Sequence, residues 1–409
     1  IVLVGLFFSL TSCFSSGVSI STLKEEIASD NSLASFYEST TQQIELRFAN
    51  LAFKGNFAEW QNNDTIKFSD NTVYLGNALA WRAATLGFED KAKVGSALQA
   101  IVDQIVDQLT VRSKLPDGSD NFGYFLRDNM TETQLTLPDK VWNVQSDAQN
   151  GDDNQMSQDQ LVHVIYGYWN AVNYINQFAS SEAWAPVLIN KIKSHAHEIG
   201  IRLKVFNYKI VDPSGAEVKR GADARGFAWP ISETIAEITG NPISTYLTSV
   251  KAIDEKRVEF FLSAEQLKDL FLDAISGLTT GICSLKVGAD QRELCNRFTI
   301  RMINALYITS GAYKAKIFYT LQMEKDEDFL GALQSRILRN EKIPAVYLDT
   351  LNSALATKFQ CDTGPVLWCQ DYRWIRLPSS CPDVCDSANL YRYSGLDFAI
   401  LYAVSRAGR

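Results

Sequence analysis

Asp-Asp-Asn-Gln-Met-Ser-Gln-Asp-Gln-Leu-Val-His-Val-Ile-Tyr-Gly-Tyr-Trp-Asn-Ala-Val-Asn-Tyr-Ile-Asn-Gln-Phe, residues 152–178, is the stretch that decides the fold. Ser157, followed three residues later by Gln160, forms a capping box and predicts a helix that begins near Gln158. At about 100° per residue, this helix has two distinct faces. The apolar face holds Leu161, Val162, Ile165, Trp169 and Val172, and the polar face holds Asp159, His163, Tyr166, Asn170 and Asn173.

The polar face of this helix carries almost no charge. From Asn154 to Ser181 the only formally charged side chain is Asp159, whereas a surface helix usually carries Lys and Glu on its polar side. We therefore expect an inner helix whose polar face borders a solvent-filled cleft, with Asp159 and His163 as candidate catalytic residues. Each residue also has a structural alternative. Asp159 would only interact with the positive end of the helix dipole, and His163 would be a hydrogen-bonded histidine of the core.

Residues 1–13 form an apolar run that ends in Cys13. The run is too short to span a membrane and has the length of a signal-peptide core. The tetrapeptide Leu-Thr-Ser-Cys at its end resembles the bacterial lipobox, which implies that Cys13 carries a lipid. We thus expect a signal peptide truncated at its start (residues 1–12) and a lipid-anchored tether (residues 13–34). The expected location is the bacterial cell envelope, on the outer membrane or the periplasmic face, or outside the cell; a plain secretory signal cleaved nearby is the alternative.

The other six cysteines also indicate export, because their number is even and all lie in the last third of the chain. Neighbours in the sequence are the simplest disulfide pairs: Cys283 with Cys295, and two bridges among the four that follow. A metal site formed by these last four is the alternative, although their spacing matches no familiar zinc pattern. The four residues are Cys361, Cys369, Cys381 and Cys385.

Charge and hydropathy limit the partners of this chain. The net charge of −8 and the isoelectric point near 5.1 argue against a nucleic-acid partner, since phosphate binding requires a basic face. After the signal no apolar run is long enough to cross a bilayer, so membrane association would rest on the lipid alone. A hydrophobic content of 46% supplies a large core. We expect residues 35–409 to form a single domain, and the protein to be a monomer.

Most of the chain has the pattern of helical hairpins. Further helices are expected between residues 262 and 355, and residues 112–156 are expected to be mostly irregular because Pro and Gly interrupt any period. Long irregular segments are often functional, and this one delivers Asp152 and Asp153 to the central helix. The other predicted helices cover residues 35–53, 70–87, 90–111 and 185–203, and one begins at 232.

This order of elements resembles the six-hairpin (α/α) toroid superfamily, which includes glycoside hydrolases and polysaccharide lyases. The resemblance implies a mainly all-α toroid of helical hairpins, with a few short strands in loops, that acts on a carbohydrate. The fold hosts non-catalytic members as well, so it implies the architecture more strongly than the reaction. The pieces that carry the resemblance are the helix pair of 74–111 leading into 123–127, the Ser-Gln-Asp-Gln of 157–160, the turn at 212–215 before Arg220, and the closing segment 393–398.

In toroids of this kind, loops at one end of the inner helices form the substrate cleft. Sugars need aromatic faces on which to stack, and acidic sugars also need guanidinium groups. The resemblance therefore implies that catalytic carboxylates lie beside aromatic and arginine side chains. The catalytic candidates are Asp152, Asp153, Asp159, His163 and Tyr166, and the substrate-binding candidates are Asp223, Arg225, Trp229, Tyr372, Arg373 and Trp374.

Two reactions fit these candidates. Hydrolysis requires two carboxylates about 5 to 10 Å apart, one of them with a raised pKa. Asp159 with Asp152 or Asp153 is the first such pair, and Asp223 or Asp397 is an alternative partner. β-Elimination requires a base and an anion clamp instead. The candidates for that reaction are His163 or Tyr166 together with Arg225.

Structural roles are the alternative for four of these side chains, namely Trp229 and Trp374 in the core and Arg225 and Arg373 in loop ion pairs. For the whole protein, the alternative is a non-catalytic lipoprotein of the same fold that binds glycans or another envelope protein. No cofactor is expected, except that Asp152 and Asp153, together with backbone carbonyls, would suit a structural calcium ion.

Overall fold

The computed structural model describes most of the first 250 residues and the end of the chain. The expected signal peptide, most of the tether, and the helices expected after residue 262 lie outside the described residues. All seven cysteines lie outside them too, so lipidation and disulfide pairing stay predictions. The described ranges are 31–62, 64–114, 118, 120–151, 153–224, 228–247, 250–251, 261–262 and 392–407.

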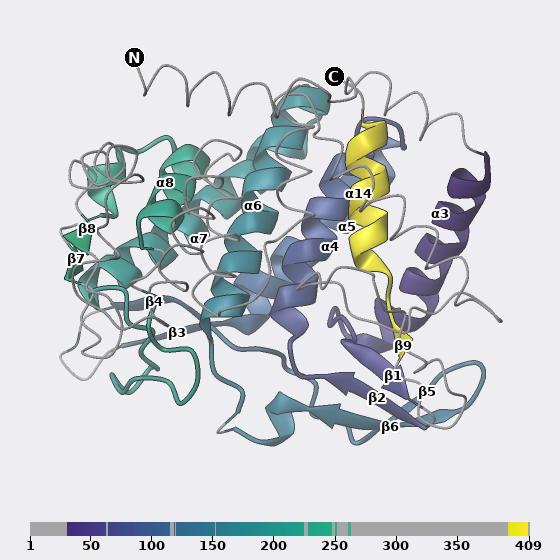
Figure 1. Cartoon of the computed structure of the whole chain (residues 1–409), viewed down its shortest axis with the longest axis horizontal. Helices are drawn as coiled ribbons and strands as arrows, with labels where there is room; N and C mark the ends of the chain where they lie inside the picture. The colour runs from purple at the N-terminus through teal and green to yellow at the C-terminus, as the bar shows by residue number, and fades with distance from the viewer. Residues whose placement is uncertain are drawn as a thin grey trace, which may run out of the picture.

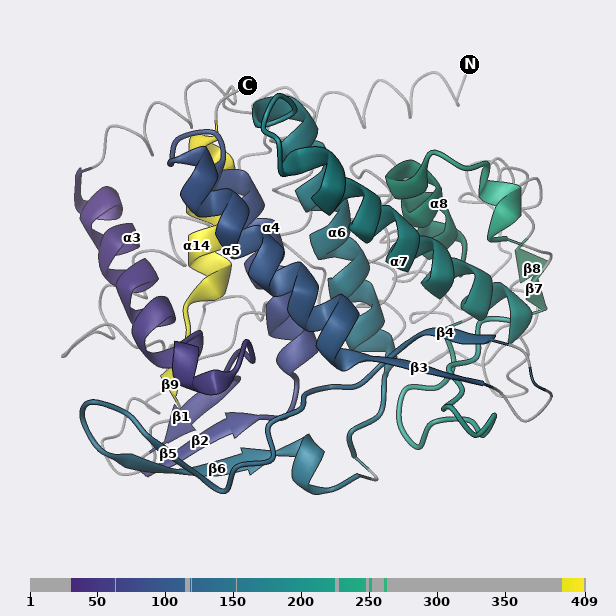
Figure 2. The same ribbon diagram turned by 180° about the vertical axis from the view of Figure 1, so that it is seen from behind.

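The helices of this part form two layers. Figure 1 shows α14, α4, α6 and α8 side by side, with α3 at the edge next to α14, and Figure 2 shows α5 and α7 covering α4 and α6 from behind. The helix nearest the C-terminus, α14, thus lies beside the early helix α4. Their bounds are α3 (Asn31–Gln43), α4 (Asn71–Thr85), α5 (Lys91–Asp103), α6 (Gln158–Phe178), α7 (Ala185–Val205), α8 (Ala228–Thr239) and α14 (Leu396–Arg406).

The expected mainly helical class is confirmed, because helices account for 56% of the described part of the chain. Two helices are shorter than the sequence predicts. The first ends at Gln43 and continues as a π-helical turn, η1 (Ile44–Phe48), and a 3-10 turn, η2 (Leu51–Phe53). Similarly, α5 ends at Asp103 and is followed by the π-helical turn η3 (Gln104–Leu109).

Residues 112–156 contain more regular structure than expected. The segment was predicted to be mostly irregular, yet it holds most of hairpin β3 (Thr110–Lys114) with β4 (Asp120–Phe125), and also β5 (Gln134–Thr136), β6 (Val141–Ser146) and the 3-10 turn η4 (Asp147–Gln149). Buried and exposed residues alternate along β6, the period of a strand with one face in the core. Pro and Gly here separate short strands instead of preventing them.

A five-stranded sheet lies at one end of the helical layers (Figure 1), with the strand order β5-β6-β2-β1-β9. Its other strands are β1 (Trp60–Asn62), β2 (Thr65–Phe68) and β9 (Arg392–Tyr393), and a separate pair is formed by β7 (Val250–Lys251) and β8 (Phe261–Leu262). Most pairs are antiparallel, but β2 and β6 are parallel, with Phe68 beside Ser146. Because α4 follows β2 and α14 follows β9, both helices begin at the sheet.

Helices α4 and α6 touch through their backbones. A Cβ on Gly76 would lie 2.2 Å from the backbone oxygen of His163, and one on Gly167 would lie 2.4 Å from the backbone oxygen of Gly76. Such distances leave no room for any side chain atom. Two glycines therefore allow α4 and α6 to approach until their backbones touch, and this contact fixes the position of α6 relative to α4.

The central helix α6 begins as predicted at Gln158, behind a capping box in which the amide of Ser157 donates to Oε1 of Gln160 at 2.9 Å. Its polar face is buried rather than solvent-filled at three of its five positions. His163 and Tyr166 are 1% exposed and Asn170 is fully buried. The expected cleft along this face is therefore wrong for these side chains.

Candidate active site

Parallel pairing of β2 and β6 brings two carboxylates together. Because both strands run in the same direction and Phe68 pairs with Ser146, the chain leaves the sheet at the same edge after each strand. Asp147 comes directly after β6, and Asp70 comes two residues after β2. The two acidic residues are far apart in the sequence, and the register of one strand pair makes them neighbours.

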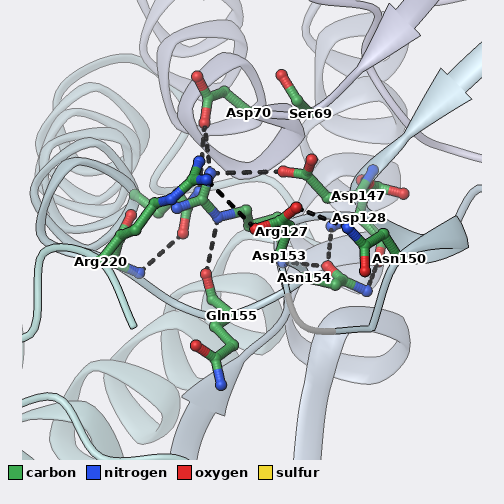
Figure 3. Close-up of polar contacts among 12 residues, drawn as sticks. Ser69, Asp70, Arg127, Asp128, Asp147, Asn150, Asp153, Asn154, Gln155 and Arg220 are labelled. Atoms are coloured by element: carbon green, nitrogen blue, oxygen red, sulfur yellow. Dashed lines mark hydrogen bonds and ion pairs between the residues drawn. The ribbon is translucent and has the colours of Figure 1, made fainter. Parts of the chain in front are cut away.

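Arg127 lies between these two carboxylates (Figure 3). Its Nη1 is 3.3 Å from Oδ1 of Asp70 and 3.4 Å from Oδ2 of Asp147, and its Nε donates to the backbone oxygen of Gln155 at 2.8 Å. The two carboxylate oxygens contact the same nitrogen and are therefore at most 6.7 Å apart. The side chains of Arg127, Asp70 and Asp147 are 13%, 17% and 17% exposed, so all three reach solvent.

Asp147 is the carboxyl of this group with the most altered ionisation. Burial is the main reason that its pKa is raised from the ordinary 3.8 to about 7. The negative charges of Asp70 and Asp128 also raise this pKa, while the positive charges of Arg127 and Lys67 lower it. A carboxyl that is half protonated near neutral pH can donate a proton and take it back.

Asp128 lies behind Asp147 and is fully buried. Burial raises its pKa to about 6, and hydrogen bonds from the 146–148 turn and from Met130 act in the opposite direction. Its Oδ1 accepts from Oγ of Ser146 at 2.6 Å and from the amide of Met130 at 2.9 Å, and its Oδ2 accepts from the amide of Asp147 at 3.1 Å. This carboxylate therefore organises the backbone around Asp147.

The segment that leads into α6 is held against the same group. Oδ1 of Asn154 accepts from the amides of Arg127 and Asp128 at 2.9 and 3.1 Å, and its Nδ2 donates to the backbone oxygen of Asp128 at 2.9 Å. The amide of Met156 donates to the hydroxyl of Tyr124 at 3.3 Å. The N-terminus of α6 is thereby placed beside the N-terminus of α4.

The loop at residues 219–223 lies on the start of α6. Gly221 has a φ of +61°, and its Cβ position is 3.3 Å from Cβ of Ser157. The amide of Lys219 donates to Oε1 of Gln155 at 2.9 Å, and Nη2 of Arg220 lies 3.6 Å from Asp153. Arg220 is 75% exposed, so this loop brings a second guanidinium to the edge of the group in Figure 3.

The predicted site residues have several different positions. Asp159 is half-buried in the first turn of α6, where it accepts a hydrogen bond from the hydroxyl of Ser157. Asp153 is half-buried and pairs with Arg220 and Asn150. The backbone oxygen of Asp223 accepts from Nε2 of Gln158. These three candidates therefore lie around the start of α6.

Two predicted catalytic residues belong to the core instead. Nδ1 of His163 lies 2.6 Å from the backbone oxygen of Asp159 in the preceding turn, and the backbone oxygen of Tyr166 accepts from Nδ2 of Asn170 at 2.8 Å. Both side chains are buried. Trp229 lies in the first turn of α8, with its side chain outside the description. Asp152, Arg225, Tyr372, Arg373 and Trp374 lie outside the described residues, as does the side chain of Asp397.

Four residues of the group were not among the predicted site residues. In the sequence, Asp70 is only the first residue of a predicted helix, and Arg127 is only the end of a resembling segment. Asp128 and Asp147 lie in the segment that was expected to be irregular. A signal was present in the alternation of residues 141–146, which could have shown that Asp147 directly follows a strand.

Two kinds of feature are absent from the described residues. Within them, no three His, Cys, Asp or Glu side chains gather as metal ligands would, and no helix is long and apolar enough to cross a membrane. Comparison with models of known protein families, with curated proteins and with solved structures found no match. The function is therefore inferred from the geometry of the group itself.

Proposed function

We propose that this protein is an exported bacterial lipoprotein that hydrolyses a glycosidic bond by acid/base chemistry. The observation that carries the proposal is the pair Asp70 and Asp147 on one guanidinium, with the pKa of Asp147 at about 7. Glycoside hydrolysis uses two carboxyl groups, one protonated and one ionised, about 5 to 10 Å apart, and the oxygens of this pair that contact Arg127 are at most 6.7 Å apart. Asp147 would donate the proton to the leaving oxygen, and Asp70 would act as the base or nucleophile.

Asp159 remains a second candidate for the ionised carboxylate. It begins the same helix, α6, whose Gln160 side chain lies 3.5 Å from Oδ1 of Asp70. The positive end of the helix dipole favours a charged carboxylate at this position. We therefore assign the general acid to Asp147. Either Asp70 or Asp159 would be the base or nucleophile, and the variants below distinguish the two.

The arrangement of helices supports an (α/α) toroid. Helices α4 and α14 both begin at the sheet, and α6 begins beside Asp70, so these neighbours run in the same direction with α3, α5 and α7 outside them. The contact of α14 with α4 joins the end of the chain to its first inner helix, as closure of a ring requires. Export and lipidation are supported by the lipobox-like residues 10–13.

Hydrolysis is favoured over β-elimination because His163 and Tyr166, the candidate bases for elimination, are buried. The test uses the chain from residue 14 onward, which lacks the lipidation cysteine, on a panel of neutral and acidic polysaccharides. Reducing ends and the absorbance of unsaturated uronides are measured together. New reducing ends without this absorbance are expected, whereas the absorbance would indicate a lyase.

Asp→Asn variants identify which carboxyl groups take part in the proposed hydrolysis. Asp147→Asn is expected to lower kcat/KM by about 10² to 10⁴-fold, the usual effect of removing a general acid, and either Asp70→Asn or Asp159→Asn should match it. Asp64→Asn is the matched control, because this carboxylate is 74% exposed and pairs with Lys140. Polysaccharide binding without cleavage by any form of the protein would support the non-catalytic alternative instead.

A further inference from the structure

Asp128 is a buried carboxylate that accepts hydrogen bonds from the proposed acid and from the residue before it. It is fully buried, so it has no exposed surface on which to contact a polysaccharide. Its carboxylate accepts hydrogen bonds from Ser146, Asp147 and Met130, at 2.6, 3.1 and 2.9 Å. Two of the three donors are therefore Asp147 itself and the residue before it.

The turn that carries Asp147 is fixed at its first residue. Ser146 is the N-cap of η4, and its Oγ accepts from the amide of Ala148 at 2.9 Å while it donates to Asp128. The side chain of Asn154 in turn holds the backbone amide and the backbone oxygen of Asp128. The orientation of the Asp147 backbone thus depends on one carboxylate that is itself held on two sides.

We propose that Asp128 is a positioning residue for the reaction proposed above, because its carboxylate holds the turn that presents Asp147 to Arg127 and Asp70. This inference rests on the proposed function. The charge of Asp128 acts on Asp147 as well, together with those of Arg127, Asp70 and Lys67, the charged groups that face Asp147 from the neighbouring segments. Orientation and ionisation of the acid therefore both depend on Asp128.

The test is Asp128→Asn, which keeps the shape of the side chain but replaces one acceptor oxygen with a donor. An amide NH₂ would then face a hydroxyl or amide donor, and the turn would shift. We expect kcat to fall about 10- to 100-fold, with KM nearly unchanged because the residue does not touch substrate. The ¹³C resonance of the Asp147 carboxyl should also titrate at lower pH than in the wild type, since a negative neighbour has been removed.

Two further variants keep the test decisive. Ser146→Ala keeps the charge of Asp128 but removes its hydroxyl donor and the cap of η4, so kcat should fall several-fold. Asp64→Asn, an exposed carboxylate made neutral, should change neither kcat nor the titration of Asp147. Ser146→Ala thus reports a local effect at the turn, and Asp64→Asn reports the general effect of losing a negative charge.

A positioning role for Asp128 requires that Asp128→Asn has both a lower kcat and a shifted titration of Asp147. A folded Asp128→Asn protein with the wild-type kcat overturns it, and so does a lower kcat without any shift in the titration of Asp147, which would indicate a merely structural residue. If Asp128→Asn does not fold, an unchanged kcat in Ser146→Ala overturns it. If the wild type cleaves no glycan, the proposed function fails, while the titration in Asp128→Asn still shows whether Asp128 controls the ionisation of Asp147.

Discussion

Asp70 occupies the N-cap position of α4, yet its carboxylate caps no backbone amide of that helix and instead lies 3.3 Å from Nη1 of Arg127. A capping Asp usually stabilises a helix by about 1 kcal/mol. Here the side chain at the N-cap position holds a guanidinium instead. Departures from a local rule of this kind are typical of functional sites.

Loss of Arg127 should destabilise the protein. In Arg127→Gln the largely buried carboxylates of Asp70 and Asp147 lose their shared cation, and removal of one partner from such a group costs about 3 kcal/mol. Urea unfolding measures this difference. Arg112→Gln is the matched control, because Arg112 is 49% exposed and lies 3.7 Å from Glu198, and its loss should cost about 1 kcal/mol or less. Equal stability losses in both variants would contradict the central role of Arg127.

Stability should fall as the pH rises from about 4 to 7. The pKa values of Asp147 and Asp128, about 7 and about 6, lie above the ordinary 3.8, so in this window the folded protein binds protons that the unfolded chain releases. Their contribution to stability is complete below about pH 4 and is lost as the pH passes through the folded-state values. Urea midpoints measured from pH 4 to pH 8 should show a smaller decline in Asp147→Asn than in the wild type. The same slope in both proteins would mean that Asp147 does not titrate in this range.

Gly76→Ala should disrupt the contact between α4 and α6. The new methyl group would lie 2.2 Å from the backbone oxygen of His163, and backbone cannot yield as a side chain can. We expect a loss of about 3 kcal/mol or more, or failure to fold, because overpacking at a rigid contact forces the helices apart. Gly151→Ala has no heavy atom within 4 Å of its new Cβ and should change stability by about 0.5 kcal/mol or less. Thermal unfolding of both variants makes the comparison.

The central helix could be predicted from the sequence because its signals are local. The capping box at Ser157 and the apolar periodicity lie within α6 itself, and both correctly placed its start. The proposed site could not be predicted in the same way. Asp70 and Asp147 become neighbours only through the parallel register of β2 with β6, and such pairing depends on residues far apart in the chain.

The uncharged polar face of α6 correctly indicated an inner helix but wrongly predicted a solvent-filled cleft along that face. A polar, uncharged face indicates an inner helix, but it does not tell whether water or other side chains cover that face. In the structure His163, Tyr166 and Asn170 are covered, and Nδ2 of Asn170 donates to its own helix. Uncharged polar residues can satisfy their hydrogen bonds within the helix that carries them, so their presence alone does not indicate a cleft.

The contact between α14 and α4 also determines when folding can be completed. Leu396 follows Thr85 by 311 residues, so a ribosome must add all of these residues before α14 can cover its side of α4. Contacts that close so large a loop form late and slowly. Until then, the apolar side of α4 that α14 covers is open to other chains, and this exposure makes the growing polypeptide a substrate for chaperones.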